Sequence, residues 1–66
     1  MRTGTLKWFD TDKGYGFILP SDGGEDIFVR QAAFDAAGLG TAQGQALSFN
    51  VSRAPDGLQA TDLSAR

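Results

Sequence analysis

The amino-acid sequence predicts an all-β fold: a small five-stranded antiparallel β-barrel with one short helical turn between the third and fourth strands. Three observations support this prediction. Short runs of β-branched and aromatic residues recur along the chain, and turns rich in glycine, proline and aspartate separate them. Only one segment, residues 31–37, has a composition typical of a helix. Closing so small a sheet would also pair both of its edge strands.

The first predicted strand covers residues 3–9. Successive side chains of a strand point to opposite faces, so Leu6 would share a face with Trp8. By the same rule Lys7 would share the other face with Phe9. Both faces would then carry a ring, and the pattern does not decide which face is buried. A β-bulge in this strand would break the alternation.

A polar loop over residues 10–14 leads to the second predicted strand, Tyr15–Leu19. Proline cannot continue a central ladder, so this strand ends at Pro20. Tyr15 and Phe17 share one face of the strand, while Ile18 lies on the other. Ile18 suits a hydrophobic core, and the two rings need a second explanation.

A turn over residues 21–24 separates this strand from a third, at about residues 25–30. Pairing the two strands as a hairpin brings Phe17 opposite Phe28. The same register places Tyr15 opposite Arg30, and Ile18 near Ile27 on the other face. A slip by one residue would turn the rings inward, so the register is constrained. The hairpin is therefore predicted to have an aliphatic core face and an aromatic outer face.

The remaining elements follow from short patterns. The alanine-rich segment 31–37 around Phe34 predicts one or two helical turns that end at Gly38. Residues 38–44 form a loop, and alternation around Phe49 predicts a half-buried fourth strand over residues 47–52. A turn over residues 54–57 precedes a fifth strand at about residues 58–63. Phe34 and Phe49 are assigned to the core.

Composition excludes several functional classes. The 66 residues indicate one domain (1–66) with a formal charge of −2 and neither Cys nor His. The absence of Cys and His removes disulfides, thiolate ligands, the usual zinc nitrogen and the commonest general base. No activated nucleophile or suitable carboxylate pair stands in for them, so we expect no enzyme and no cofactor or metal. With no signal peptide and no apolar run long enough to span a membrane, we expect a cytoplasmic protein without a membrane partner.

The rings of the aromatic face are predicted to be a stacking surface for nucleobases. A domain of this size draws only about 3–5 kcal/mol of net stability from its core. Burying one Phe-sized side chain is worth about 1.5–3 kcal/mol, so rings left in water forgo stability that the chain needs. The acidic charge argues against a duplex-DNA binder, but stacking can carry the affinity for single strands.

Three ordered motifs, Lys7-Trp8-Phe9, Lys13-Gly14-Tyr15-Gly16-Phe17-Ile18 and Ile27-Phe28-Val29, resemble the bacterial cold-shock domain family over essentially the whole chain. The resemblance implies an OB-type barrel that binds single-stranded RNA or DNA with little sequence specificity, as an RNA chaperone or antiterminator. It also places Trp8 on the ring face, with Leu6 turned inward across a bulge. The binding positions that it implies are Lys7, Trp8, Lys13, Tyr15, Phe17 and Phe28.

The chain departs from the family pattern at several positions. Gln31 stands where the family usually has Phe, and Leu39 lies near another usual Phe. Two stacking platforms are thereby lost, so we expect weaker, micromolar binding. Arg30 replaces a usual His; its guanidinium can stack on a base or pair with phosphate, which makes it the seventh predicted binding residue. Asp10 replaces a usual Asn, and Leu58 a usual Pro.

These departures and the acidic charge leave a second hypothesis open. The chain could instead be a degenerate OB-barrel that serves as a protein-interaction module, as one unit of a longer protein. We expect a monomer, with exchange of strands into a dimer as the alternative.

Overall fold

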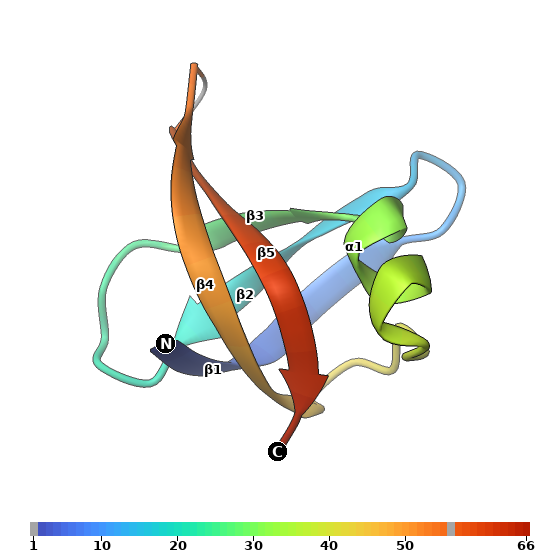
Figure 1. Cartoon of the computed structure of the whole chain (residues 1–66), viewed down its shortest axis with the longest axis horizontal. Coiled ribbons are helices and arrows are strands. Elements are labelled where there is room, and N and C mark those ends of the chain that lie inside the picture. The colour runs from blue at the N-terminus through green and yellow to red at the C-terminus, as the bar shows by residue number, and fades with distance from the viewer. Residues whose placement is uncertain (1, 56) are drawn as a thin grey trace.

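The computed structural model describes residues 2–55 and 57–66 (Figure 1). The elements, in chain order, are β1 (Arg2–Asp10), β2 (Tyr15–Pro20), β3 (Ile27–Arg30), α1 (Gln31–Ala37), β4 (Ala46–Ala54) and β5 (Gly57–Ala65). The predicted all-β class, with one short helix between the third and fourth strands, is confirmed. Within the described residues no helix has the length and apolar character that crossing a membrane requires.

The five strands form one sheet that closes on itself in the order β1-β2-β3-β5-β4, and β4 returns to pair with β1. Four of the neighbouring pairs are antiparallel, as predicted, but β3 and β5 run parallel and meet at Phe28 and Gln59. The prediction of a wholly antiparallel arrangement is therefore wrong in this pair. Strand direction cannot alternate all the way around a closed ring with an odd number of strands, so at least one pair must be parallel.

The predicted hairpin register is confirmed. In the β2–β3 pair, Tyr15 lies opposite Arg30, Phe17 opposite Phe28 and Ile18 opposite Ile27. The third strand is shorter than predicted, because it begins at Ile27 and not near residue 25. Pro20 has no N–H to donate, and it pairs with Gly4 of β1 alone, so the β2–β3 ladder stops before it.

Strands β4 and β5 are longer than predicted and form a hairpin that projects beyond the rest of the molecule (Figure 1). The predicted turn between them includes Asp56, which lies outside the described residues. The ladder is irregular between Ser48 and Asn50, opposite Asp62, which has a left-handed φ of 52°. The Asn50 side-chain amide donates a hydrogen bond of 3.1 Å to the Asp62 carboxylate.

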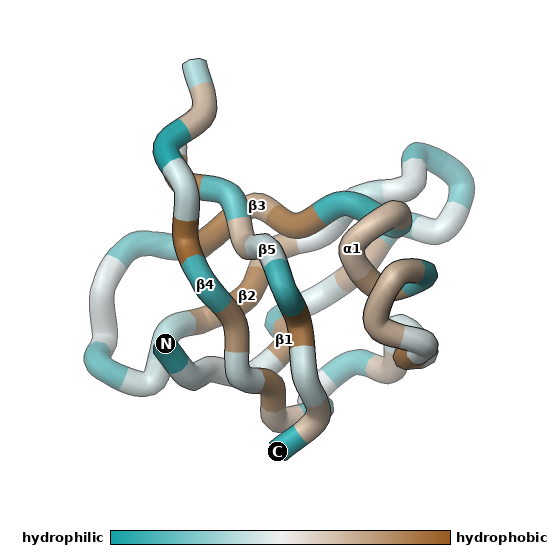
Figure 2. The backbone as a smooth tube through the Cα atoms, in the orientation of Figure 1, coloured by the Kyte–Doolittle hydropathy of each residue, from teal (hydrophilic) through white to brown (hydrophobic). Residues whose placement is uncertain are grey.

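The inward faces of the strands form the hydrophobic core, and polar residues fill most of the connecting loops (Figure 2). The predicted assignment of Phe34 and Phe49 to this core is confirmed, since both are 0% exposed. The buried set is Leu6, Ile18, Ile27, Val29, Phe34, Leu47, Phe49, Ala60 and Leu63.

Helix α1 packs mainly against β5 and places Phe34 under it as part of the core. It ends where the sequence predicts, because Gly38 adopts a left-handed φ of 69° and its N–H approaches the carbonyls of Phe34 and Asp35. This conformation is open to glycine at little steric cost.

Strands β1 and β2 leave no room for a side chain at Gly16. A Cβ atom there would lie 2.3 Å from the Trp8 carbonyl oxygen and 2.8 Å from both the Cα and a ring carbon of Phe9. The ring of Phe9 thus lies across Gly16 and meets Phe34 edge to face, with their ring centroids 5.4 Å apart. Only a residue without a side chain fits at position 16.

We therefore expect Gly16→Ala to lower the free energy of unfolding by about 1–3 kcal/mol, because the added methyl group meets backbone atoms that cannot move aside. Urea denaturation followed by circular dichroism measures this change. Gly40→Ala is the matched control, since a Cβ at Gly40 meets no atom within 4 Å. Equal stability of the two variants would contradict the close approach.

Candidate nucleic-acid interface

A β-bulge in β1 determines which side chains face outward. Leu6 pairs with Ile18, but the next paired residue is Trp8, opposite Phe17, so Lys7 is the extra residue of β1. The shift returns Leu6 to the core while Trp8 joins the outer face. The predicted bulge, with Leu6 turned inward, is confirmed.

Four aromatic side chains gather on the outer face of β1, β2 and β3. Trp8 is 37% exposed, and Tyr15, Phe17 and Phe28 are partly buried. The ring centroid of Trp8 lies 5.3 Å from that of Phe17, and Phe28 lies 5.4 Å from Tyr15 and 5.7 Å from Phe17. We call this set, Trp8, Tyr15, Phe17 and Phe28, the aromatic face.

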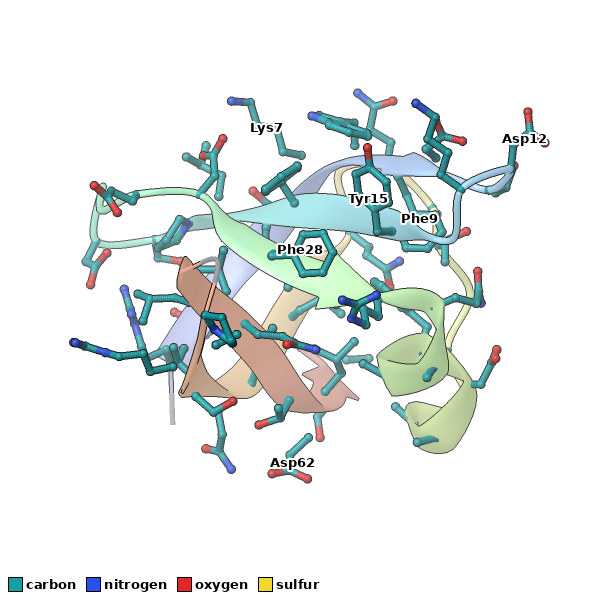
Figure 3. All side chains as sticks on the ribbon, turned by 90° about the horizontal axis from the view of Figure 1, so that it is seen from above. Lys7, Phe9, Asp12, Tyr15, Phe28 and Asp62 are labelled. Carbon is teal, nitrogen blue, oxygen red and sulfur yellow. The ribbon has the colours of Figure 1, made fainter. Side chains whose placement is uncertain are left out.

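The rings support one another at angles that leave parts of their flat surfaces open. Tyr15 meets Phe17 edge to face at 89°, and Trp8 meets Tyr15 at 62°. Edge-to-face contacts of this kind are worth about 0.5–1.5 kcal/mol each beyond the area that they bury. The rings are thereby held in place on the surface. Tyr15 and Lys7 project from the side of the molecule opposite Asp62 (Figure 3).

Two cationic side chains, Lys7 and Arg30, belong to strands that carry this face. The ammonium group of Lys7 lies 2.9 Å from the Asp26 carboxylate, and both side chains are substantially exposed. The guanidinium carbon of Arg30 lies 5.0 Å from the centroid of the Phe28 ring, within the range of a cation–π contact. Arg30 is thus held beside a ring, and Lys7 beside a carboxylate.

Lys13 is exposed in the loop between β1 and β2. The Asp10 carboxylate accepts hydrogen bonds from the backbone N–H groups of Asp12 and Lys13, at 3.0 and 3.1 Å. This Asx-type turn shapes the loop. It also keeps the Asp10 carboxylate engaged with the backbone, close to the base of the Lys13 side chain.

The structure gathers four of the seven predicted site residues in the aromatic face and places Arg30 against Phe28, and the role of all seven in binding stays a prediction. The seven are Lys7, Trp8, Lys13, Tyr15, Phe17, Phe28 and Arg30, and they come from β1, β2, β3 and the loop that joins β1 to β2. Phe9 is partly buried against the core.

The two positions where the family usually has Phe do not offer a platform. The Gln31 side chain, at the start of α1, donates a hydrogen bond of 3.0 Å to the Asp35 carboxylate. Leu39 packs against the core.

Sequence reasoning missed three residues that lie at this region. Asp26 forms the ion pair with Lys7, and Leu58 and Gln59 line a hollow beside Phe17 and Phe28. These contacts join residues far apart in the chain, so no local pattern predicts them. Within the described residues no group of acidic side chains is arranged to hold a metal ion.

Comparisons with known proteins point to one family. A family model described as "'Cold-shock' DNA-binding domain" matches residues 2–65. The Cold shock-like protein CspA of Stigmatella aurantiaca is 48% identical over 64 residues, which cover 96% of this chain and 94% of the relative. The Probable cold shock protein A of Mycolicibacterium smegmatis is 44% identical over 64 residues, 96% of each chain. The Protein lin-28 homolog of Drosophila melanogaster is 37% identical over 67 residues, but this match covers only 34% of that protein.

The partial burial of the rings predicts how much stability each contributes. We expect Phe28→Ala to lower the free energy of unfolding by about 0.8–1.5 kcal/mol, roughly half of what full burial of such a ring is worth. Phe49→Ala removes a fully buried ring and should cost about 3–5 kcal/mol, which is comparable to the whole stability of so small a domain. Circular dichroism with urea denaturation separates the two. If Phe28→Ala is as damaging as Phe49→Ala, the Phe28 ring belongs to the core.

Proposed function

Because this chain belongs to the family of 'Cold-shock' DNA-binding domains, a nucleic-acid-binding and non-enzymatic family, we propose that it binds single-stranded RNA or DNA by stacking bases on its aromatic face. The observation that carries the proposal is the aromatic face itself. Trp8, Phe17 and Phe28 lie on three adjacent strands, on the side turned away from the core. Every base has a flat π surface, so such a face accepts a single strand with little dependence on sequence.

The affinity follows from the number of rings. Each stacked base is worth about 1–3 kcal/mol, so the four rings would supply roughly 4–12 kcal/mol before the cost of ordering a flexible strand is subtracted. A micromolar complex requires about 8.2 kcal/mol, which lies inside this range. Gln31 and Leu39 add no ring, one being bonded to Asp35 and the other packed on the core. We therefore propose affinities near micromolar, weaker than those of relatives with a full set of rings.

Electrostatic attraction plays the smaller part in this proposal. Lys7, Lys13 and Arg30 offer contacts to about two or three phosphates, against a formal charge of −2 for the whole chain. The ion pair between Lys7 and Asp26 is a modest obstacle, since exposed pairs of this kind are worth at most about 1 kcal/mol. A phosphate group can therefore displace Asp26 from Lys7 at small cost.

Binding of this kind changes RNA structure without catalysis. A base can stack on the aromatic face only when it is unpaired, so the protein binds the open state of a hairpin and not the closed one. A ligand that binds one of two states shifts the equilibrium toward that state. We propose that the chain melts weak secondary structure in this way, as an RNA chaperone does.

The first test is a titration with hexathymidylate at low salt, followed by the fluorescence of Trp8. Stacking should quench the emission, and Phe17→Ala should weaken binding by about tenfold, as expected for the loss of one stacked base. Asp62→Asn is the control, because Asp62 lies on the opposite side of the molecule (Figure 3). Asn keeps the size of the side chain and tolerates the left-handed φ there. Its affinity should not fall below that of wild type, since the substitution removes only a remote negative charge, which at low salt repels phosphate.

Absence of any quenching or NMR shift at millimolar oligonucleotide would contradict nucleic-acid binding. The exposed rings would then favour the interaction-module hypothesis. Equal losses in Phe17→Ala and Asp62→Asn would show that the strand lies elsewhere on the surface.

The second test is the dependence of affinity on salt. With about three phosphate contacts, the logarithm of the binding constant should fall with the logarithm of salt concentration at a slope near −2, from roughly −0.7 per contact. Lys13→Gln should make the slope shallower by about 0.7. Arg66→Gln removes the same charge at the C-terminus, where the Arg66 backbone N–H donates to Ala46 of β4, a strand that carries no ring of the aromatic face, and should leave the slope unchanged. Equal slopes for Lys13→Gln and wild type would remove Lys13 from the interface.

A further inference from the structure

A hollow of about 180 Å³ lies where the aromatic face meets the β4–β5 hairpin. Its walls include Phe17, Phe28, Arg30, Leu58 and Gln59. Pockets that enclose a drug-sized ligand usually measure about 300–1,000 Å³, so this smaller hollow suits one flat ring system. The side chains of Phe17, Phe28, Ala54 and Leu58 make its walls largely apolar, and Arg30 and Gln59 supply the polar groups.

The fold holds these two polar side chains beside the same ring. Gln59 is the residue of β5 that pairs with Phe28 across the parallel ladder. Arg30 follows Phe28 by two residues on β3, and its guanidinium carbon lies 5.0 Å from the centroid of the Phe28 ring. Among the described residues no side-chain hydrogen bond engages the Arg30 guanidinium or the Gln59 amide. Their hydrogen-bonding groups are therefore open to a ligand in the hollow.

We propose that this hollow selects guanine at one position of the bound strand. The inference rests on the proposed function and deepens it, since it assigns a base preference to a face that would otherwise accept any base. An arginine presents a planar fork of N–H donors and no acceptor. Guanine is the base whose O6 and N7 atoms form a pair of adjacent acceptors that matches this fork.

The other bases fit the same donors less well. Adenine pairs its N7 acceptor with an amino group, which would face an N–H of Arg30. Cytosine also presents an amino group, and thymine offers one acceptor next to a methyl group. Gln59 has both an amide donor and a carbonyl acceptor, so it can meet a further edge of a guanine stacked against Phe28.

The experiment uses hexathymidylate and six derivatives that carry a single dG, one at each position. Trp8 fluorescence gives the dissociation constants. We expect one derivative to bind about tenfold more tightly than hexathymidylate, the order that one bidentate contact supplies. Replacing that dG by 7-deaza-dG, which lacks the N7 acceptor, should abolish the gain.

Two variants identify the residue responsible. Arg30→Lys keeps the charge but cannot form two parallel hydrogen bonds. The ratio of the dissociation constant of hexathymidylate to that of the tightest dG derivative should therefore fall to near one, whatever happens to the affinity for hexathymidylate. Lys13→Gln should weaken the binding of both oligonucleotides by the same factor and so preserve this ratio.

Equal affinities of wild type for all seven oligonucleotides would overturn the guanine preference and leave the proposed function intact. A ratio that survives Arg30→Lys or 7-deaza-dG would also overturn it, since Arg30 would then meet phosphate and not the base. Failure to bind hexathymidylate at all would count against the proposed function itself.

Discussion

The extra residue in β1 is the constraint on which both sides of this small fold depend. Leu6 and Trp8 are two residues apart, so a regular strand would turn them to the same face. With Lys7 inserted between the two paired positions, Leu6 faces Ile18 in the core and Trp8 faces Phe17 outside. The strand can then complete the core and the aromatic face at once. Gly16 makes the arrangement possible, because the backbone at Trp8 approaches its Cα too closely for any side chain.

The core and the aromatic face contribute differently to the stability of the fold. The core is completed by Phe34 and Phe49, both fully buried, while the rings of the aromatic face keep part of their surface in water. Contacts between these outer rings, with centroids 5.3–6.3 Å apart, recover some of the stability that exposure forgoes. They also fix the rings before any ligand arrives. A face ordered in advance loses little side-chain entropy on binding, so more of the stacking energy is available as affinity.

Much of this architecture could be predicted from the sequence, because local rules specify it. Alternation along β2 fixed the hairpin register once the rings were placed on one side, and Gly38 marked the end of the helix. The bulge is harder to predict, because alternation along β1 puts a ring on both faces of the strand. Only the resemblance to a family indicated that Trp8 faces outward and Leu6 inward. The parallel β3–β5 pair, the ion pair of Lys7 with Asp26 and the place of Gln59 beside Phe28 were not predicted. Each depends on how the sheet closes, which brings together residues that no short pattern connects.

The acidic charge of the chain and its aromatic face are compatible because they act on different parts of a nucleic acid. Phosphate contacts attract every sequence alike and weaken as salt rises, whereas base-edge contacts distinguish sequences and stacking requires the bases to be unpaired. A chain with a formal charge of −2 gives up much of the first kind of binding. In the proposed mode of binding, what remains depends on whether bases are unpaired and, through the proposed contact of Arg30, on which base lies in the hollow. A binder with so little positive charge would therefore discriminate better between strands, because less of its affinity would come from contacts that cannot tell one strand from another.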